Sequence, residues 1–247
     1  NKNTITSMYI ISENCSSWNS KNSKNILNII NAELECKLCS SYGNFSLVKQ
    51  CFIWRWEIDI PYDWEYGQWE RIRLYPVQVN IFIVKCEICG KKYRVYPSFI
   101  IKGTTLTLTA LIFIAFVYET SGLSLRKIPQ KFCYENNIIA HSTIYKAIHG
   151  LGKSIADSDN KIRDSIKELK NRYLPSNKEE PGVSAWPPEK SIYEHTLRRE
   201  TALRELLLPL ANLRFEYHFC TLFYKYTRLL KTILSGLDPP ISIIYTK

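Results

Sequence analysis

Two pairs of cysteines in the amino-acid sequence have the spacing of metal ligands. Cys36 and Cys39 form one Cys-x-x-Cys unit, and Cys86 and Cys89, followed by Gly90, form a second. Because the two-residue gap lets both sulfurs of a tight turn face one ion, two such units can place four thiolates at the corners of a tetrahedron, which suits Zn²⁺. The glycine allows the positive φ that such a turn tends to need. The sequence therefore predicts a structural zinc site with these four cysteines as ligands.

The alternative use of the two pairs is as redox-active or disulfide-forming dithiols. In the first 31 residues no basic region precedes an apolar core, so no signal peptide is expected and a structural metal is the favoured interpretation. The 46 residues between the pairs exceed the usual ligand spacing. The remaining four cysteines stand alone and are expected to be small buried hydrophobic residues: Cys15, Cys51, Cys133 and Cys220.

The residues around and between the cysteine pairs predict β-structure. Before the second pair, apolar residues alternate with polar ones over 77–83, and a basic segment with Tyr93 and Val95 follows it, which is typical of strand, tight turn, strand. Between the pairs, five large apolar residues alternate with charged ones, as in a half-buried strand: Phe52, Trp54, Trp56, Ile58 and Ile60. We therefore expect a zinc ribbon over 31–97 with a β-rich insertion over 40–85.

The charge of the chain points to a polyanionic partner. The 247 residues include 33 Lys and Arg against 23 Asp and Glu, a net charge of +10. Residues 85–153 carry 10 basic and 3 acidic side chains, so most of the excess lies in this segment. Such a concentration favours nucleic acid over a solvated basic face without a partner. The ordinary composition, 45% hydrophobic and 23% charged, excludes a wholly disordered chain, a collagen-like repeat and a simple coiled coil.

Three helices are predicted in quick succession between residues 98 and 156. Residues 105–120 are apolar nearly all round, which is typical of a buried helix. Residues 124–134 follow, with basic side chains on one face. Pro129 is a defect in this second helix, because a proline in a helix interior removes a hydrogen bond, so the helix is expected to be kinked or to start later.

The third predicted helix begins at Ser142, which is expected to cap it, and ends near Gly150 and Gly152. Its apolar residues recur at helical spacing on one face: Ile144, Ala147, Ile148 and Leu151. A short polar and basic helix behind two packed helices is the helix-turn-helix arrangement, whose third helix can place side chains on base edges in a major groove of DNA.

This interpretation assigns a role to the exposed polar side chains of the second and third helices. Four basic residues are expected to contact phosphates, which position a protein without specifying sequence: Arg126, Lys127, Lys131 and Lys153. Three residues are candidates for reading bases: Thr143, Tyr145 and Lys146. His149 could do either or cap the helix, and Ser142 completes the candidate interface. The alternative is a small helical bundle that shares this pattern by chance.

The segment from Lys85 to Ile155 resembles the N-terminal zinc-ribbon and helix-turn-helix region of bacterial insertion-sequence transposases and their relatives. The similar motifs are the Cys-x-x-Cys-Gly turn, the basic strand KKYRVYPSF, the long apolar helix, SGLSLRKI and HSTIYKAIHGLGKSI. In that group, the ribbon and the helix-turn-helix recognise the ends of the mobile element. The resemblance covers roughly residues 30–155. It implies that the four paired cysteines hold zinc and that residues 142–149 form the recognition helix.

The C-terminal region, 157–247, is predicted to be helical over 159–173, 191–208 and 212–234, with a proline-rich linker over 175–188. The last helix carries an apolar stripe suited to packing on the core or on a second copy of the chain. A homodimer through the C-terminal helices is therefore a reasonable expectation.

An active transposase or recombinase with catalytic residues in this region is one alternative. Transposase chemistry needs three carboxylates around two Mg²⁺ ions, and the strands that would carry them are not predicted here. Three acidic residues are interpreted as favourable charges at a helix start: Asp157, Asp159 and Asp164. His195 and Arg198 match the HxxR motif of tyrosine recombinases, and three tyrosines lie downstream of it: Tyr217, Tyr224 and Tyr226. Such a short motif arises easily by chance. No catalytic residue is assigned.

Together these patterns predict an α+β protein: a β-rich zinc ribbon, a helix-turn-helix three-helix unit and a helical C-terminal region. The expected boundaries are 1–30 for a polar N-terminal segment, then 31–97, 98–156 and 157–247. The expected function is zinc-stabilised binding of double-stranded DNA, at element ends or an operator, by a protein of mobile-element origin. A zinc-stapled protein-interaction module is the second alternative.

The longest apolar run, residues 104–118, is shorter than the about 20 residues that cross a bilayer. We therefore expect no membrane partner and a bacterial cytoplasmic location at the nucleoid.

Overall fold

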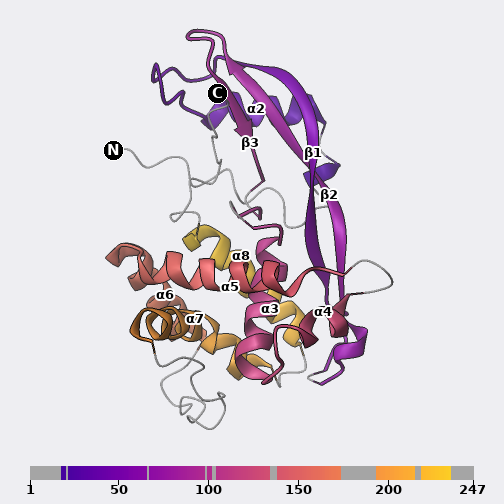
Figure 1. Cartoon of the computed structure of the whole chain (residues 1–247). Coiled ribbons are helices and arrows are strands. Elements are labelled where there is room, and N and C mark those ends of the chain that lie inside the picture. The colour runs from indigo at the N-terminus through magenta and orange to yellow at the C-terminus, as the bar shows by residue number, and fades with distance from the viewer. Residues whose placement is uncertain are drawn as a thin grey trace.

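The computed structural model describes residues 18–20, 22–65, 67–97, 99–101, 104–133, 138–173, 193–214 and 218–234. The predicted α+β class is confirmed, since a three-stranded antiparallel sheet precedes a mostly helical region. Figure 1 shows that a long hairpin reaches from the first of these parts into the second.

The hairpin consists of β1 (Phe45–Asp59) and β2 (Arg73–Cys86), and the short β3 (Lys92–Val95) pairs with the last residues of β2. The strand order is β1-β2-β3, and Phe45 lies opposite Cys86 in the register. The many β-branched and aromatic residues of both long strands favour this extended, pleated conformation. The predicted strand, tight turn and strand around the second cysteine pair are confirmed.

Helix α2 (Ser23–Glu33) packs against β1 at the cysteine end of the hairpin. The side chain of Asn22 caps it by accepting a hydrogen bond from the Asn25 backbone N–H. A small core forms between this helix and the sheet: Ile26, Ile30, Leu34, Phe45, Phe82, Val84 and Tyr93. Residues 23–30, assigned from the sequence to a polar N-terminal segment, thus form most of α2.

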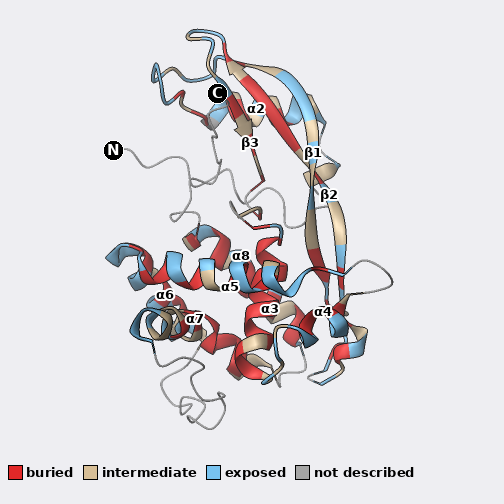
Figure 2. Cartoon of the chain, viewed as in Figure 1, coloured by how far each residue is buried: buried red, intermediate tan, exposed pale blue. Residues whose placement is uncertain are grey.

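The helical part surrounds α3 (Leu108–Thr120), in which nearly every residue is buried. Thr107 caps it through its side-chain oxygen, which accepts from the Ala110 N–H at 3.2 Å. Figure 2 shows this concentration of buried residues among the helices. The prediction of a buried apolar helix over 105–120 is confirmed. Among the described helices, none combines the length and the apolar character needed to cross a membrane.

Helix α4 (Lys127–Phe132) is shorter than the predicted 124–134. It starts late enough that Pro129 lies in its first turn, where a missing N–H costs no intrahelical hydrogen bond. The helix packs mainly against β2 and the 3₁₀ turn η2 (Trp69–Arg71). The Lys131 ammonium lies 5.8 Å from the centre of the Trp69 ring.

Helix α5 (His141–Ala156) confirms the predicted apolar face but not the predicted ends. Ser142 was expected to be the N-cap, and this was wrong: Ala140 occupies that position without a side-chain hydrogen bond, and Ser142 lies exposed in the first turn. The predicted end near Gly150 and Gly152 was also wrong, since the helix runs on past both glycines.

Gly152 is helical because it lies where α5 crosses α7 (Glu194–Leu213). A Cβ atom at this position would lie 2.9 Å from the Arg199 carbonyl oxygen and 3.0 Å from the Leu203 side chain. This glycine therefore allows the two helices to pack closely, and it does not terminate α5.

The C-terminal helices are α6 (Asn160–Tyr173), α7 and α8 (Phe219–Leu234). They correspond to the three predicted helices, although α7 extends five residues beyond its predicted end and includes Pro209. Helix α7 packs against α5, α3, α6 and α8. The predicted linker over 175–188 lies outside the described residues.

The middle of β1 differs from the predicted half-buried strand. Phe52 and Trp54 are 55% and 56% exposed, whereas Ile58 and Ile60 are buried. The hairpin connects a core under α2 with one among the helices. In the middle of β1 the opposite face of the strand packs inward, where Ile53 lies against a small cluster of Val79 and Phe99, so the face that carries Phe52 and Trp54 is exposed.

Candidate metal centre

The second cysteine pair lies in a tight turn between β2 and β3. The Cys86 N–H donates to the Lys91 carbonyl oxygen at 2.9 Å, and the Gly90 N–H donates to the Cys86 carbonyl oxygen at 2.8 Å. Gly90 has a φ of 73°. The predicted need for a residue that tolerates a positive φ after this pair is therefore met.

The first pair lies in a turn with the same hydrogen bonds. The Cys36 N–H donates to the Ser41 carbonyl oxygen at 2.8 Å, and the Ser40 N–H donates to the Cys36 carbonyl oxygen at 2.7 Å. Ser40 has a φ of 55° and is the only described non-glycine residue with a positive φ. A left-handed conformation at a non-glycine residue is strained and is retained where surrounding structure requires it. Here the positive φ of Ser40 gives the first turn the same shape as the second, in which Gly90 has a positive φ.

The two turns bring four sulfur atoms together, all within 4.8 Å of one another. The Cys36 and Cys89 sulfurs are 3.5 Å apart, and those of Cys39 and Cys86 are 3.7 Å apart. Thiolates bound tetrahedrally to zinc at about 2.3 Å would be separated by about 3.8 Å. These distances far exceed the about 2.05 Å of a disulfide, and all four cysteines are free. The cluster could therefore hold a metal ion.

Hydroxyl groups beside the sulfurs favour their charged form. Burial raises the pKa of Cys36, but hydrogen bonds from the Tyr93 hydroxyl and from the backbone N–H groups of Cys39 and Leu38 outweigh it and lower the pKa to about 6. Burial likewise raises the pKa of Cys86, and hydrogen bonds, first among them that of Ser41, lower it below its ordinary value.

Cys89 shows the opposite behaviour. A backbone hydrogen bond from Lys91 lowers its pKa, but burial and the neighbouring sulfurs of the other three cysteines raise it to about 12. Thiolates this close repel one another, so the cluster cannot hold its full negative charge without a cation. A dication among the sulfurs would remove this repulsion.

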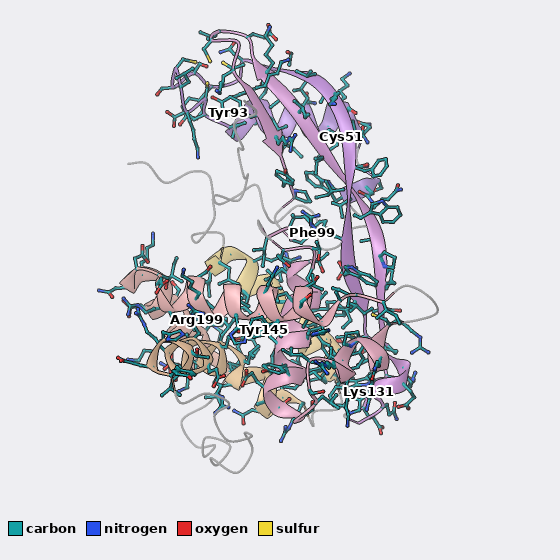
Figure 3. The ribbon with its side chains drawn as sticks, in the orientation of Figure 1. Cys51, Tyr93, Phe99, Lys131, Tyr145 and Arg199 are labelled. Atoms are coloured by element: carbon teal, nitrogen blue, oxygen red, sulfur yellow. The ribbon has the colours of Figure 1, made fainter. Side chains whose placement is uncertain are left out.

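The surroundings hold the sulfurs in place. Cys36 and Cys86 are fully buried, and so is Tyr93, whose ring packs edge-on against Phe45. Figure 3 shows Tyr93 at this end of the sheet, close to the sulfur atoms. A site with four protein ligands leaves no open position for a substrate, which is typical of structural metal sites.

Tyr93 and Ser41 were not identified as functional residues from the sequence. The Tyr93 hydroxyl lies 3.0 Å from the Cys36 sulfur, and the Ser41 hydroxyl lies 3.1 Å from the Cys39 sulfur and 3.4 Å from that of Cys86. Ser41 lies two residues after Cys39, so its place beside the first pair can be read from the sequence. Tyr93 lies on β3, 57 residues from Cys36, and its contact with that sulfur cannot be read from the sequence.

The residues predicted to bind DNA lie on two separate helices. On α5, the side chains of Ser142, Tyr145, Lys146 and Lys153 are exposed, and those of Thr143 and His149 are partly exposed. The Tyr145 and His149 rings are 4.1 Å apart between centres. The apolar face of the helix is buried against α3 and α7.

The remaining three candidates lie on or just before α4: Arg126, Lys127 and Lys131, all exposed. Figure 3 labels Lys131 on α4 and Tyr145 on α5. Because α4 packs mainly on β2 and η2 and α5 packs on α7 and α3, the two helices are held by different neighbours.

Three of the residues considered for catalysis in the C-terminal region have structural partners. The Asp159 carboxylate accepts from the Ile162 N–H at the start of α6, as the capping interpretation predicted. Arg198 of the HxxR motif donates to the Ala156 carbonyl oxygen at 2.6 Å and thus satisfies the end of α5. Tyr226 is buried and donates to the Leu206 carbonyl oxygen. Tyr217 lies outside the described residues.

Comparison of the chain with known protein families finds no match, and neither a curated protein nor a solved structure matches it significantly.

Proposed function

We propose that the cysteine cluster holds one structural Zn²⁺ ion that stabilises the sheet end of the protein. The observation that carries this proposal is the approach of four sulfurs, from two turns of the same shape, to within 4.8 Å. With zinc bound, the turns, β3 and α2 are held together around a core too small to be stable alone.

Elemental analysis tests the metal directly. We expect about one zinc per chain after purification without chelator, and release of zinc with loss of β-structure when a strong chelator is added. Cys86→Ser should lose the metal, whereas the matched control Cys51→Ser, on β1 outside the cluster, should keep it. A folded wild-type protein without any bound metal would contradict the proposal.

We further propose that the protein binds double-stranded DNA through α5. The supporting observation is that α5 contains no acidic residue and exposes Tyr145, Lys146 and Lys153, while its opposite face is buried against α3 and α7. A helix presented in this way can enter a major groove, with Thr143, Tyr145 and Lys146 near base edges.

The charge of the neighbouring segment supports the same partner. Arg126, Lys127 and Lys131 are exposed on or beside α4, where they would contact phosphates. The acidic residue on α3, Glu119, is buried against Arg204 and therefore does not oppose DNA at the surface.

A salt titration with labelled duplex DNA tests DNA binding. Affinity should fall by roughly 10³-fold between 50 and 200 mM salt if several phosphates are contacted. Lys146→Glu should weaken binding strongly, and Lys161→Glu, an equal charge reversal exposed on α6, should weaken it much less. Absence of binding at low salt, or equal effects of the two reversals, would contradict a role for α5.

The finer proposal is that the DNA site is a mobile-element end or an operator. It is supported by the resemblance of residues 85–155 to the DNA-binding region of insertion-sequence transposases. Selection of bound sequences from a random duplex pool is the test. A recovered consensus that matches inverted repeats flanking the coding region would support it, and random recovery would contradict it.

Strand cleavage is the less favoured alternative. Within the described residues, the cysteine cluster is the one group of three or more histidines, cysteines and acids placed to hold a metal ion. The described parts of residues 157–234 are helical, and Tyr226 is buried. Mg²⁺-dependent cleavage of bound DNA that is abolished by Asp159→Ala or Tyr226→Phe would favour an enzyme.

A protein-interaction role is favoured by one observation. Phe52 and Trp54 are both exposed on β1, with their ring centres 6.4 Å apart in an edge-to-face arrangement. Exposed aromatic residues that touch one another are frequent at protein interfaces. Retention of a protein partner by the wild type and its loss in Phe52→Ser/Trp54→Ser, with DNA binding unchanged, would support this second role.

A further inference from the structure

Gly150 lies exposed in the interior of α5, where glycine is less favourable than any residue except proline. Its backbone is helical and its φ is not positive, so no unusual conformation requires a glycine here. It also does not end the helix, which continues to Ala156.

Packing does not require this glycine either. A Cβ atom added at Gly150 would meet no described atom within 4 Å beyond its own stretch of α5, whereas one added at Gly152 would meet α7. Apart from turns and close packing, glycine is used where a backbone and a ligand approach each other closely. The open position at Gly150 therefore suits a ligand that lies directly against α5.

Three polar side chains surround this open position. Lys146 lies one helical turn before Gly150, and Lys153 and Ser154 lie one turn after it. Spacings of three and four residues place side chains next to one another on a helix surface, and all three side chains are exposed. Two ammonium groups and a hydroxyl group are typical partners of a phosphate.

The charge around Gly150 favours a polyanion over a second protein helix. Helix α5 contains no acidic residue, and Asp157, directly after its end, is paired with Arg198 at 3.7 Å. A protein helix that packed here would need an apolar surface to bury. The exposed side chains three and four residues from Gly150 are instead polar: Lys146, Lys153 and Ser154.

The position of Gly150 along the helix fits the backbone of DNA better than its bases. A recognition helix contacts base edges mainly through its N-terminal residues. Gly150 lies two turns after Thr143, in the C-terminal half of α5. This half is where a helix that enters a groove by its first turns would pass a strand of the sugar-phosphate backbone.

We propose that the sugar-phosphate backbone of duplex DNA lies directly against Gly150, so that the Lys153 ammonium and the Ser154 hydroxyl reach one phosphate while Lys146 reaches base edges. The inference rests on the duplex binding proposed for α5 and adds the residue that sets how closely the helix approaches DNA. Any side chain at position 150 would hold the helix and the phosphate apart.

Gly150→Ala tests the contact without risk to the fold, because the added methyl group enters open space in a helix. Its affinity for a labelled duplex at about 50 mM salt should fall at least about tenfold, the equivalent of one hydrogen bond to a charged group. The slope of log affinity against log salt should become shallower by about 1, because one phosphate contact is lost. Urea unfolding should show no loss of stability.

Asn171→Ala is the matched control, since it also introduces an alanine at an exposed helical position, on α6. It should change neither the affinity nor the salt slope. Lys153→Ala should weaken binding by about as much as Gly150→Ala. The double variant Gly150→Ala/Lys153→Ala should lose less than the product of the two single effects, because both substitutions act on the same phosphate.

Wild-type affinity and salt slope in Gly150→Ala would overturn the proposal and leave duplex binding by α5 in place. Fully multiplicative effects of Gly150→Ala and Lys153→Ala would also overturn it. Loss of a dimer in Gly150→Ala on sedimentation, with unchanged DNA affinity, would assign the open position to a second copy of the chain instead. Absence of duplex binding by the wild type would overturn the function proposed for α5 together with this contact.

Discussion

The Tyr93 hydroxyl lies 3.0 Å from the Cys36 sulfur and is buried with it. The contact joins β3 to the first cysteine turn, 57 residues away in the sequence. It is the hydrogen bond that does most to lower the pKa of Cys36, against the effect of burial.

Tyr93→Phe should therefore weaken metal binding without unfolding the protein. The ring keeps its packing against Phe45, and the hydroxyl that donates to the sulfur is lost. Loss of an outer hydrogen bond typically reduces metal affinity by about 10- to 100-fold. Competition with a chromophoric chelator measures the change. Tyr42→Phe, which removes an exposed hydroxyl near the same turn, is the control, and equal affinities of the two variants would show that the Tyr93 contact is unimportant.

Gly152→Ala should destabilise the protein by about 1–3 kcal/mol, because the added methyl group overlaps the Arg199 carbonyl oxygen on α7. Gly150→Ala on the same helix meets no atom within 4 Å and should stabilise by about 0.5–1 kcal/mol through helix propensity. Urea unfolding of both variants measures the difference. Two changes of the same sign would mean that α5 and α7 are not in the close contact described.

The buried ion pair between Glu119 of α3 and Arg204 of α7 provides a third prediction. Its Oε2–Nε distance is 3.1 Å, and the glutamate is wholly buried. Arg204→Met should cost about 3–5 kcal/mol because it leaves an uncompensated buried charge, and Glu119→Gln added to it should restore part of that loss. Chemical denaturation of the single and double variants measures it. The exposed Glu168–Arg172 pair is the control, with an expected effect below about 1 kcal/mol.

Glu57 should make stability depend on pH. Burial raises its pKa, while hydrogen bonds from Ile58 and Thr107 and the charge of Lys231 act in the opposite direction. The folded state therefore holds this proton to higher pH than the unfolded state does. Its contribution to stability is complete below the ordinary glutamate pKa of about 4.3 and is lost as pH rises through the higher folded value.

Glu57→Gln should remove that dependence and raise stability at neutral pH relative to the wild type. Thermal unfolding of both proteins across this pH range, compared with the exposed substitution Glu65→Gln, isolates the contribution. A wild type and a Glu57→Gln variant with parallel pH profiles would show that the carboxyl group is not perturbed by burial.

Local patterns in the sequence predicted much of the fold. The two cysteine pairs identified the cluster, because turn geometry fixes two sulfurs at this spacing wherever the turn lies. Alternating residues of β2 and the apolar composition of α3 predicted strand and helix for similar reasons, since each reflects the immediate surroundings of its own element. Of the three acidic residues interpreted as capping, Asp159 does cap α6, whereas Asp157 ends α5 and Asp164 lies within α6.

Other features depend on contacts between distant residues, and the tertiary structure alone decided them. Gly152 follows the apolar residues of α5 as a helix-terminating glycine would, yet the close contact with α7 requires a glycine at this position inside the helix. Phe52 alternates like a core residue, yet it is the neighbouring Ile53, on the other face of β1, that packs against Val79 and Phe99, and Phe52 is exposed. Glu57 resembles a surface charge of a strand, yet it is buried, and its carboxylate accepts a hydrogen bond from Thr107, the cap of α3. Strand pairing, helix crossing and burial bring together residues that are far apart in the chain, and no local sequence pattern encodes these contacts.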